Sequence, residues 1–312
     1  MEYIHKPVLL RESIEALNIR PDGIYVDGTL GRAGHSREIA QRLTTGRLIC
    51  IDRDGAAIDA AKERLAPWLD RVTLVRGNFS ELAEILQDCK IPAADGSLFD
   101  LGVSSPQLDD AARGFSYMHD APLDMRMDTS APLTAYEVVN GWSEGELRRI
   151  LYDYGEERYA PAISRAILRY REGRPIETTL ELVEIIKSAM PPKALREKQH
   201  PAKRSFQAIR IAVNGELDAL EPMVEAATAA LRPGGRLAVI TFHSLEDRII
   251  KRAMLAQAQG CTCPPDFPVC VCGKKPKLKI LTRKPIVSGD EELTENPRAR
   301  SAKLRVAEKC KL

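Results

Sequence analysis

The chain has 312 residues, of which 44% are hydrophobic, 29% charged and 5% aromatic, a composition that excludes disordered and fibrous proteins and suggests about two domains. The formal net charge is only +2, but basic residues gather in two segments: residues 273–312 hold 12 Lys or Arg against 5 Asp or Glu, and residues 192–210 hold 6 against 1. Such segments predict a polyanionic partner, although a solvated surface could carry the same charges.

The sequence also indicates where the protein resides. Its longest strongly apolar run, residues 237–242, is far shorter than the roughly 20 residues that cross a bilayer. The first twenty residues lack the apolar core of a signal peptide. Seven cysteines form an odd number, and four of them crowd into residues 261–272, which fits a reducing compartment better than a disulfide framework. We expect a cytoplasmic protein with no membrane segment.

The first hundred residues alternate between strand-like and helix-like patterns. Short apolar runs predict strands at residues 24–26, 48–51, 72–75 and 98–101, with a fifth at 237–242. Apolar residues at three- and four-residue intervals predict helices at residues 36–43, 55–65 and 80–87. This alternation predicts an α/β fold with a doubly wound parallel sheet and right-handed crossovers.

The alternation stops after the fourth strand. Three capping-box patterns begin at Thr134, Ser143 and Thr178 and predict helix starts. We interpret residues 109–203 as an inserted helical domain that divides the sheet domain into residues 1–108 and 204–312. The second part then contains one helical pattern from Phe206 to Val224, a turn at 232–235, a helix at 246–257, and two last strands at 278–282 and 304–307.

A glycine-rich turn follows the first strand. Residues 28–34 read Gly-Thr-Leu-Gly-Arg-Ala-Gly, and such a backbone lets a ligand approach closely beside a helix N-terminus. The G-x-x-G-x-x-G spacing differs from the G-x-G-x-x-G of dinucleotide-binding proteins, which disfavours a nicotinamide-dependent oxidoreductase. Asp52 ends the second strand, where doubly wound folds place a carboxylate for ribose hydroxyls, or it is a turn residue. Phe79 follows the third strand and either stacks on a base or packs in the core.

Polar residues follow the fourth strand, in the segment Asp100-Leu-Gly-Val-Ser104-Ser-Pro-Gln107. Ligands of open α/β sheets lie beyond the carboxyl ends of the strands, so we expect these residues at the reacting edge. The segment lacks the second glycine of a nucleophile elbow, which argues against a serine hydrolase.

Eight segments spread over nearly the whole chain closely resemble the bacterial ribosomal RNA small subunit methyltransferase H family: residues 27–36, 51–54, 100–110, 113–116, 122–128, 154–158, 242–248 and 295–301. The resemblance implies a class I S-adenosylmethionine-dependent methyltransferase fold, Rossmann-like, with an inserted helical domain for RNA recognition. It implies methylation of N4 of a cytosine in the decoding centre of 16S rRNA, in the small ribosomal subunit. It also implies contacts to the methyl donor from Ala33, Gly34, His35, Asp52, Phe79, Asp100 and Gln107.

An exocyclic amine is a poor nucleophile because its lone pair is delocalised into the ring. Acceptors must therefore orient its N–H groups, and we assign this role to Asp100 and the backbone around Ser104. Asp100 or His243 could accept the released proton. Asp100 could equally serve only to bind the cofactor, and His243 could only cap the following helix.

The target base must leave its stack to reach the methyl donor. Phe115, Tyr117 or Phe242 could hold it there. A non-catalytic RNA-binding module remains a second alternative, because it would explain the basic segments, but it would leave the polar strand ends without a purpose.

Four cysteines form a short loop in front of the basic C-terminal segment. They are arranged as Cys261-Thr-Cys263 and Cys270-Val-Cys272, a pattern that could hold one tetrahedral zinc ion or could be a reduced, proline-rich loop. No metal is assigned to the reaction itself.

Overall fold

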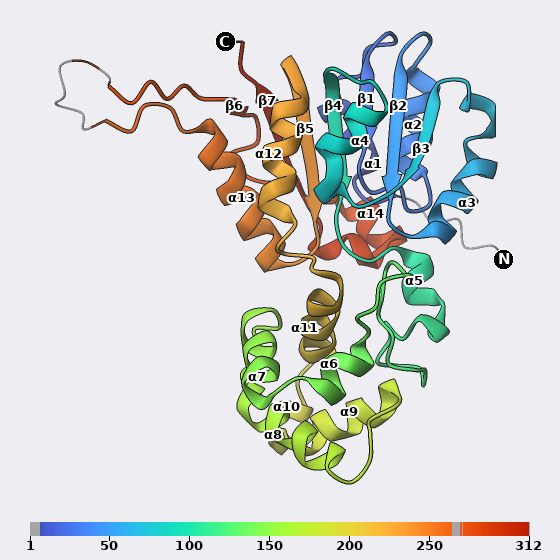
Figure 1. Cartoon of the computed structure of the whole chain (residues 1–312), viewed down its shortest axis with the longest axis vertical. Coiled ribbons are helices and arrows are strands. Elements are labelled where there is room, and N and C mark those ends of the chain that lie inside the picture. Colours follow the sequence, from blue (N-terminus) through green and yellow to red (C-terminus); the bar gives the residue numbers. More distant parts are fainter. Residues whose placement is uncertain (1–6, 264–268, 270, 312) are drawn as a thin grey trace. The chain divides into compact units, whose positions relative to one another are not determined.

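The computed structural model describes residues 7–263, 269 and 271–311, which separate into two compact units (Figure 1). Unit 1 comprises the chain up to Gly102 and from Leu217 onward, and unit 2 comprises Val103–Glu216. The expected boundaries at 108/109 and 203/204 fall inside unit 2. The helix that follows the second of them is part of that unit because Phe206 and Ile209 belong to its hydrophobic core.

A seven-stranded sheet forms the centre of unit 1, in the order β3-β2-β1-β4-β5-β7-β6. The first five strands are parallel, and β7 is antiparallel to both β5 and β6. The strands are β1 (Ile24–Asp27), β2 (Arg47–Asp52), β3 (Val72–Arg76), β4 (Ala94–Asp100), β5 (Leu231–Thr241), β6 (Leu278–Ile280) and β7 (Lys303–Lys309). The predicted doubly wound α/β sheet is confirmed.

Helices cover both faces of this sheet (Figure 1). One layer contains α1 (Leu10–Leu17), α2 (Gly34–Arg42) and α3 (Gly55–Arg64), and the other contains α4 (Leu82–Asp88), α12 (Leu220–Ala230) and α13 (Ser244–Ala258). Alternate residues of β2 serve the two cores: Leu48 and Cys50 pack with the first layer, Ile49 and Ile51 with the second. A strand buried on both faces therefore reads as the continuous apolar run seen in the sequence.

Shorter elements complete unit 1. They are η1 (Ala66–Trp68), η2 (Phe79–Glu81), α14 (Asp290–Glu295) and η4 (Pro297–Ser301). Among the described residues of the whole chain, no helix is long and apolar enough to cross a membrane.

Unit 2 is helical around its own core. Its elements are α5 (Ser105–Asp109), η3 (Ala111–Arg113), α6 (Ala135–Gly141), α7 (Glu144–Asp153), α8 (Ala160–Arg171), α9 (Thr179–Ser188), α10 (Pro192–Leu195) and α11 (Lys203–Asn214). All three predicted capping boxes are confirmed: Thr134, Ser143 and Thr178 each accept the backbone N–H of the glutamate three residues later, whose side chain accepts their own N–H in return.

Two local predictions were wrong. The single helical pattern from Phe206 to Val224 is two helices, because Gly215 adopts a left-handed conformation (φ 59°) and ends α11. The turn expected at 232–235 lies inside β5, where the pairing with β4 shifts register between Ala94 and Gly96. The proline and glycines there form an irregularity of the strand instead of ending it.

Candidate active site

Three strands of the sheet end in an aspartate at the same edge. These residues are Asp27 in β1, Asp52 in β2 and Asp100 in β4. β1 lies between β2 and β4, so the strand order reverses beside it. Open α/β sheets bind ligands at this reversal, beyond the carboxyl ends of the strands. The topology therefore brings the three carboxyl groups to the edge where a ligand is expected.

The turn between β1 and α2 exposes backbone rather than side chains. Gly31 (φ 49°) and Ala33 (φ 58°) are both left-handed, a conformation that costs an alanine roughly 1–2 kcal/mol. Ala33 is the N-cap of α2 and makes no side-chain cap, and helix N-termini of this kind can bind polar or anionic groups of a ligand. Gly34 begins the helix, and a Cβ there would collide with Pro7. The glycine at position 34 is therefore explained by packing against Pro7, and the left-handed backbone at Ala33 is the feature that points to a ligand.

Asp27 stabilises this turn from the protein interior through hydrogen bonds. It is 1% exposed, accepts the Ser36 hydroxyl at 2.6 Å, and accepts the Thr29 N–H at 3.1 Å. The same hydroxyl lies 3.2 Å from the thiol of Cys50. Burial raises the pKa of Asp27 to about 6, although both hydrogen bonds oppose the shift. Asp27 is thus a buried titratable group at the candidate site, and its burial could not be predicted from its position at the end of a strand.

Asp52 connects the glycine-rich turn to the end of β2. Its Oδ2 accepts the Gly31 N–H at 2.8 Å and its Oδ1 accepts the Asp54 N–H at 2.9 Å. Burial raises the pKa of Asp52, and these two N–H groups limit the rise. A carboxylate oxygen has two lone pairs, so each oxygen retains one with which to accept a ribose hydroxyl. The turn-residue interpretation and the cofactor-binding interpretation are thus compatible.

Asp100 has an oxygen atom that the protein leaves unsatisfied. Its Oδ1 is buried and accepts no hydrogen bond from the described residues, while Oδ2 lies 3.8 Å from Nδ1 of His35. Burial, together with the charges of Asp27 and Glu246, raises the pKa of Asp100 well above its ordinary value. Buried polar atoms are nearly always satisfied in a folded protein. An acceptor without a donor, at the reversal of the strand order, is therefore the strongest structural sign of a ligand site.

Phe79 packs in the core. Its side chain is 8% exposed, and its ring contacts Phe99 edge to face with 6.0 Å between the ring centroids. Stacking of Phe79 on a cofactor base stays a prediction.

Ser104 and Gln107 belong to unit 2, at the start of α5. The side-chain oxygen of Gln107 accepts the Ser104 N–H at 3.0 Å, and Gln107 is 5% exposed. Gln107 therefore has a local structural role, and its cofactor contact, like the reacting role of Ser104, stays a prediction.

His243 caps α13, as one of the two interpretations expected. Its Nδ1 accepts the Glu246 N–H at 3.3 Å, and Glu246 accepts the His243 N–H in return, so that the two form a capping box. Because Nδ1 is an acceptor, the proton of the neutral ring resides on Nε2, which lies 3.1 Å from Oε1 of Glu246 but forms no hydrogen bond with the described residues. The capping role leaves the neutral ring with no open lone pair.

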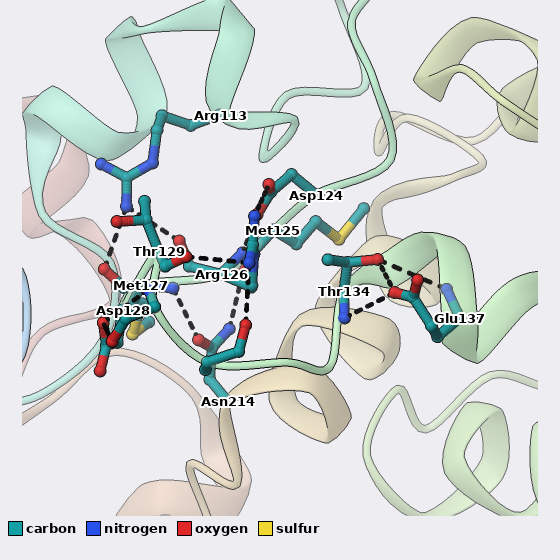
Figure 2. A network of polar contacts seen from close by, with 12 residues as sticks. Arg113, Asp124, Met125, Arg126, Met127, Asp128, Thr129, Thr134, Glu137 and Asn214 are labelled. Atoms are coloured by element: carbon teal, nitrogen blue, oxygen red, sulfur yellow. Dashed lines mark hydrogen bonds and ion pairs between the residues drawn. The ribbon is translucent and has the colours of Figure 1, made fainter.

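A polar network in unit 2 holds residues 122–128 in place (Figure 2). Arg126 binds both carboxylate oxygens of Asp124, at 2.9 and 2.7 Å. Arg113 donates to the carbonyls of Arg126 and Met127. Asn214, at the end of α11, accepts the Met127 N–H at 2.8 Å and donates to the Met125 carbonyl at 2.7 Å. The segment is thereby held by distant parts of unit 2, and no local pattern in the sequence predicts the role of Asn214.

The three aromatic residues considered for holding a base have different surroundings. Phe115 is 6% exposed and lies in the core of unit 2, while Phe242 is partly buried against the core of unit 1. Tyr117 stacks on the ring of His200 with 4.6 Å between the centroids and meets Phe206 edge to face. Tyr117 is thus the one of the three that belongs to an aromatic stack.

Relatives of this chain share its whole length. A protein named Ribosomal RNA small subunit methyltransferase H from Paenibacillus sp. (strain JDR-2) is 59% identical, over 98% of this chain and 99% of its own. A protein of the same name from Brevibacillus brevis (strain 47) is 57% identical, over 99% of both chains. A solved structure of a putative rRNA-methylase from Clostridium thermocellum aligns with a TM-score of 0.45 and 11% identity over 98% of both chains, and no argument rests on that likeness.

These full-length similarities confirm the resemblance inferred from the eight motif segments. The model of the MraW methylase family matches residues 2–310, and this chain therefore belongs to the MraW methylase family.

Proposed function

We propose that the protein transfers a methyl group from S-adenosylmethionine to N4 of a cytosine in the decoding centre of 16S rRNA, in the cytoplasm. It is a class I methyltransferase that uses S-adenosylmethionine. This assignment leaves no support for the two alternatives, an oxidoreductase and a non-catalytic RNA-binding module. The full-length relatives named for small-subunit rRNA support the substrate. The observation that carries the chemistry is the unsatisfied Oδ1 of Asp100.

The residues at the strand ends fit the cofactor. The start of α2, which Ala33 cannot cap with its side chain, would hold the polar groups of the cofactor through N–H donors. Asp52 would accept its ribose hydroxyls with the lone pairs that Gly31 and Asp54 leave open. When bound, the cofactor supplies an electrophilic methyl group on a sulfonium. In our proposal the protein orients the amine and receives its proton.

Asp100 is the better of the two candidate proton acceptors. A carboxyl group whose pKa is raised by burial holds a proton more tightly than an exposed one. His243 would have to give up the N–H of Glu246 before its Nδ1 could take a proton. We infer that Oδ1 of Asp100 accepts an N–H of the cytosine amine, which aligns the nitrogen and provides a place for the released proton.

Unit 2 carries features suited to RNA. The basic segment 192–210 includes Lys203 and Arg204 at the start of α11, and the Tyr117–His200 stack lies in the same unit. Phosphates bind to such cations, and unstacked bases bind to such rings. We propose that these residues bind the substrate rRNA.

The test is single-turnover methylation with labelled S-adenosylmethionine, on naked 16S rRNA and on assembled 30S particles. Asp100→Asn should lower the rate by about 10² or more at saturating donor, while the matched control Asp59→Asn, on the exposed side of α3, should not. Full recovery of Asp100→Asn at saturating donor would reduce Asp100 to a cofactor ligand. Mass spectrometry of digested rRNA should locate the methyl on an exocyclic cytosine nitrogen, and a methyl on ring carbon or ribose oxygen would overturn the substrate assignment.

A further inference from the structure

Three cysteine side chains converge in the loop between α13 and β6, outside the site described above. The Sγ atoms of Cys261, Cys263 and Cys272 all lie within 4.8 Å of one another, and the Sγ atoms of Cys261 and Cys272 are 3.6 Å apart. A disulfide would need about 2.05 Å. A tetrahedral zinc ion with Zn–S bonds of about 2.3 Å places its sulfur ligands about 3.8 Å apart. The separation therefore excludes a disulfide, and it suits either a hydrogen bond between two thiols or two thiolates that share one ion.

The backbone of the loop is arranged to stabilise thiolate charge. The Thr262 N–H donates to Sγ of Cys272 at 3.5 Å, and the Cys263 N–H donates to Sγ of Cys261 at 3.4 Å. Hydrogen bonds to a charged form favour that form, and outer-shell donors of this kind orient metal ligands. Cys261 and Cys272 are exposed and Cys263 is half-buried, so an ion can reach all three.

We propose that Cys261, Cys263 and Cys272 bind a zinc ion. Thiolates are soft ligands that select zinc over the hard cations Mg²⁺ and Ca²⁺. The fourth position of the ion would take a further donor. Cys270 is close in sequence, but it lies outside the described residues and is not part of the proposed site.

The ion would close a loop whose ends the fold already holds together. At the far end of the loop, the Lys277 N–H donates to the Gln257 carbonyl at 2.8 Å, and the Lys277 carbonyl accepts the Cys310 N–H at 2.9 Å. Between the cysteines and this anchor stand Lys274 and Lys275. Zinc would order these lysines for contact with a polyanion, so its role is structural and separate from methyl transfer.

The experiment measures metal content in the full chain, expressed with added zinc and dialysed under reducing conditions against metal-free buffer. We expect about one zinc per chain by mass spectrometry of the element. Cys263→Ser should reduce the zinc content to background, whereas Cys89→Ser, a cysteine next to the end of α4 and outside the loop, should keep it. Cys263→Ser should unfold at the same temperature as the metal-free parent, because the loop is at the surface.

Cobalt replacement gives a second reading that does not depend on activity. Co²⁺ added to the metal-free chain should produce a thiolate-to-metal charge-transfer band, which Cys263→Ser should weaken and Cys89→Ser should leave intact. Zinc at background in the unaltered chain, zinc fully retained in Cys263→Ser, or an intramolecular disulfide among these cysteines after purification with reductant would each overturn the proposal.

Discussion

Replacing Asp27 by asparagine should remove a stability cost that grows with pH. The side chain is fully enclosed, accepts one N–H through Oδ1 and one hydroxyl through Oδ2, and has a pKa of about 6. Asparagine has the same shape and can keep both contacts, because its amide can donate to the Ser36 hydroxyl, which can then donate to the Cys50 thiol. The substitution therefore removes the ionisation and preserves the packing.

The sign and size of the effect follow from linkage. Asp27 has an ordinary pKa of 3.8 when unfolded and about 6 when folded, so the folded state binds the proton more tightly. The resulting stability is fully present below pH 3.8 and is lost as the pH rises through 6. At 1.36 kcal/mol per pKa unit, the loss is about 3 kcal/mol. The unfolding free energy of the parent, relative to Asp27→Asn, should fall by most of that amount, about 2.4 kcal/mol, between about pH 4 and pH 7.

The assay is urea unfolding at a series of pH values, read in unit 1 alone. The chain has two tryptophans, Trp68 beside the first-layer core of unit 1 and Trp142 beside the core of unit 2. In a Trp142→Phe background, fluorescence reports the unfolding of unit 1. The control Asp59→Asn alters an exposed carboxylate of α3 and should not reproduce the effect. A difference between parent and Asp27→Asn that stays constant within about 1 kcal/mol from pH 4 to pH 7 would refute the reasoning.

Three further outcomes are expected. Asp52→Ala should weaken S-adenosylmethionine binding by about 1–3 kcal/mol, because charge-assisted hydrogen bonds are lost; unchanged affinity in calorimetry would remove this residue from the cofactor site. Asn214→Ala should destabilise unit 2 by about 1–3 kcal/mol, since it leaves buried backbone groups unsatisfied; unfolding followed by Trp142 fluorescence checks this. Reversing the charges of Lys203 and Arg204 should flatten the salt dependence of rRNA binding by roughly one unit of slope per lost phosphate contact, and an unaltered slope would identify them as surface residues only.

Local signals predicted much of the fold. β1 and β2 are largely buried on both faces and appear in the sequence as apolar runs. The observed ends of β1 to β3 differ from the predicted ones by one residue at most, whereas β4 begins at Ala94, four residues before its predicted start. The capping boxes at Thr134, Ser143 and Thr178 were predictable because a cap involves residues only three positions apart. Gly215 was also a local signal, but the apolar spacing continued across it and concealed the break.

Contacts between distant residues could not be predicted in this way. Asp52 accepts a hydrogen bond from the N–H of Gly31, which is 21 residues away in the sequence. Asn214 accepts one from the N–H of Met127, which is 87 residues away. Such pairs depend on how the elements pack, which a pattern along the chain does not record. The same holds for the unsatisfied oxygen of Asp100, because the charged groups near it, Asp27 and Glu246, are distant in the sequence. The position of Asp100 at a strand end made it a predictable site residue. That its Oδ1 lacks a hydrogen-bond donor among the described residues could not be predicted from the sequence.

The insertion of unit 2 has a consequence for synthesis on the ribosome. β4 pairs with β5, yet all of unit 2 and α12 are translated between them. At 5–20 residues per second, residues 101–230 take on the order of ten seconds to emerge. Throughout that interval β5 is absent, so β4 is the unpaired edge of the part of the sheet made by β1 to β4. An unpaired edge strand is prone to pairing with other chains. Fast, independent folding of unit 2 would keep this period from exceeding the time that translation requires.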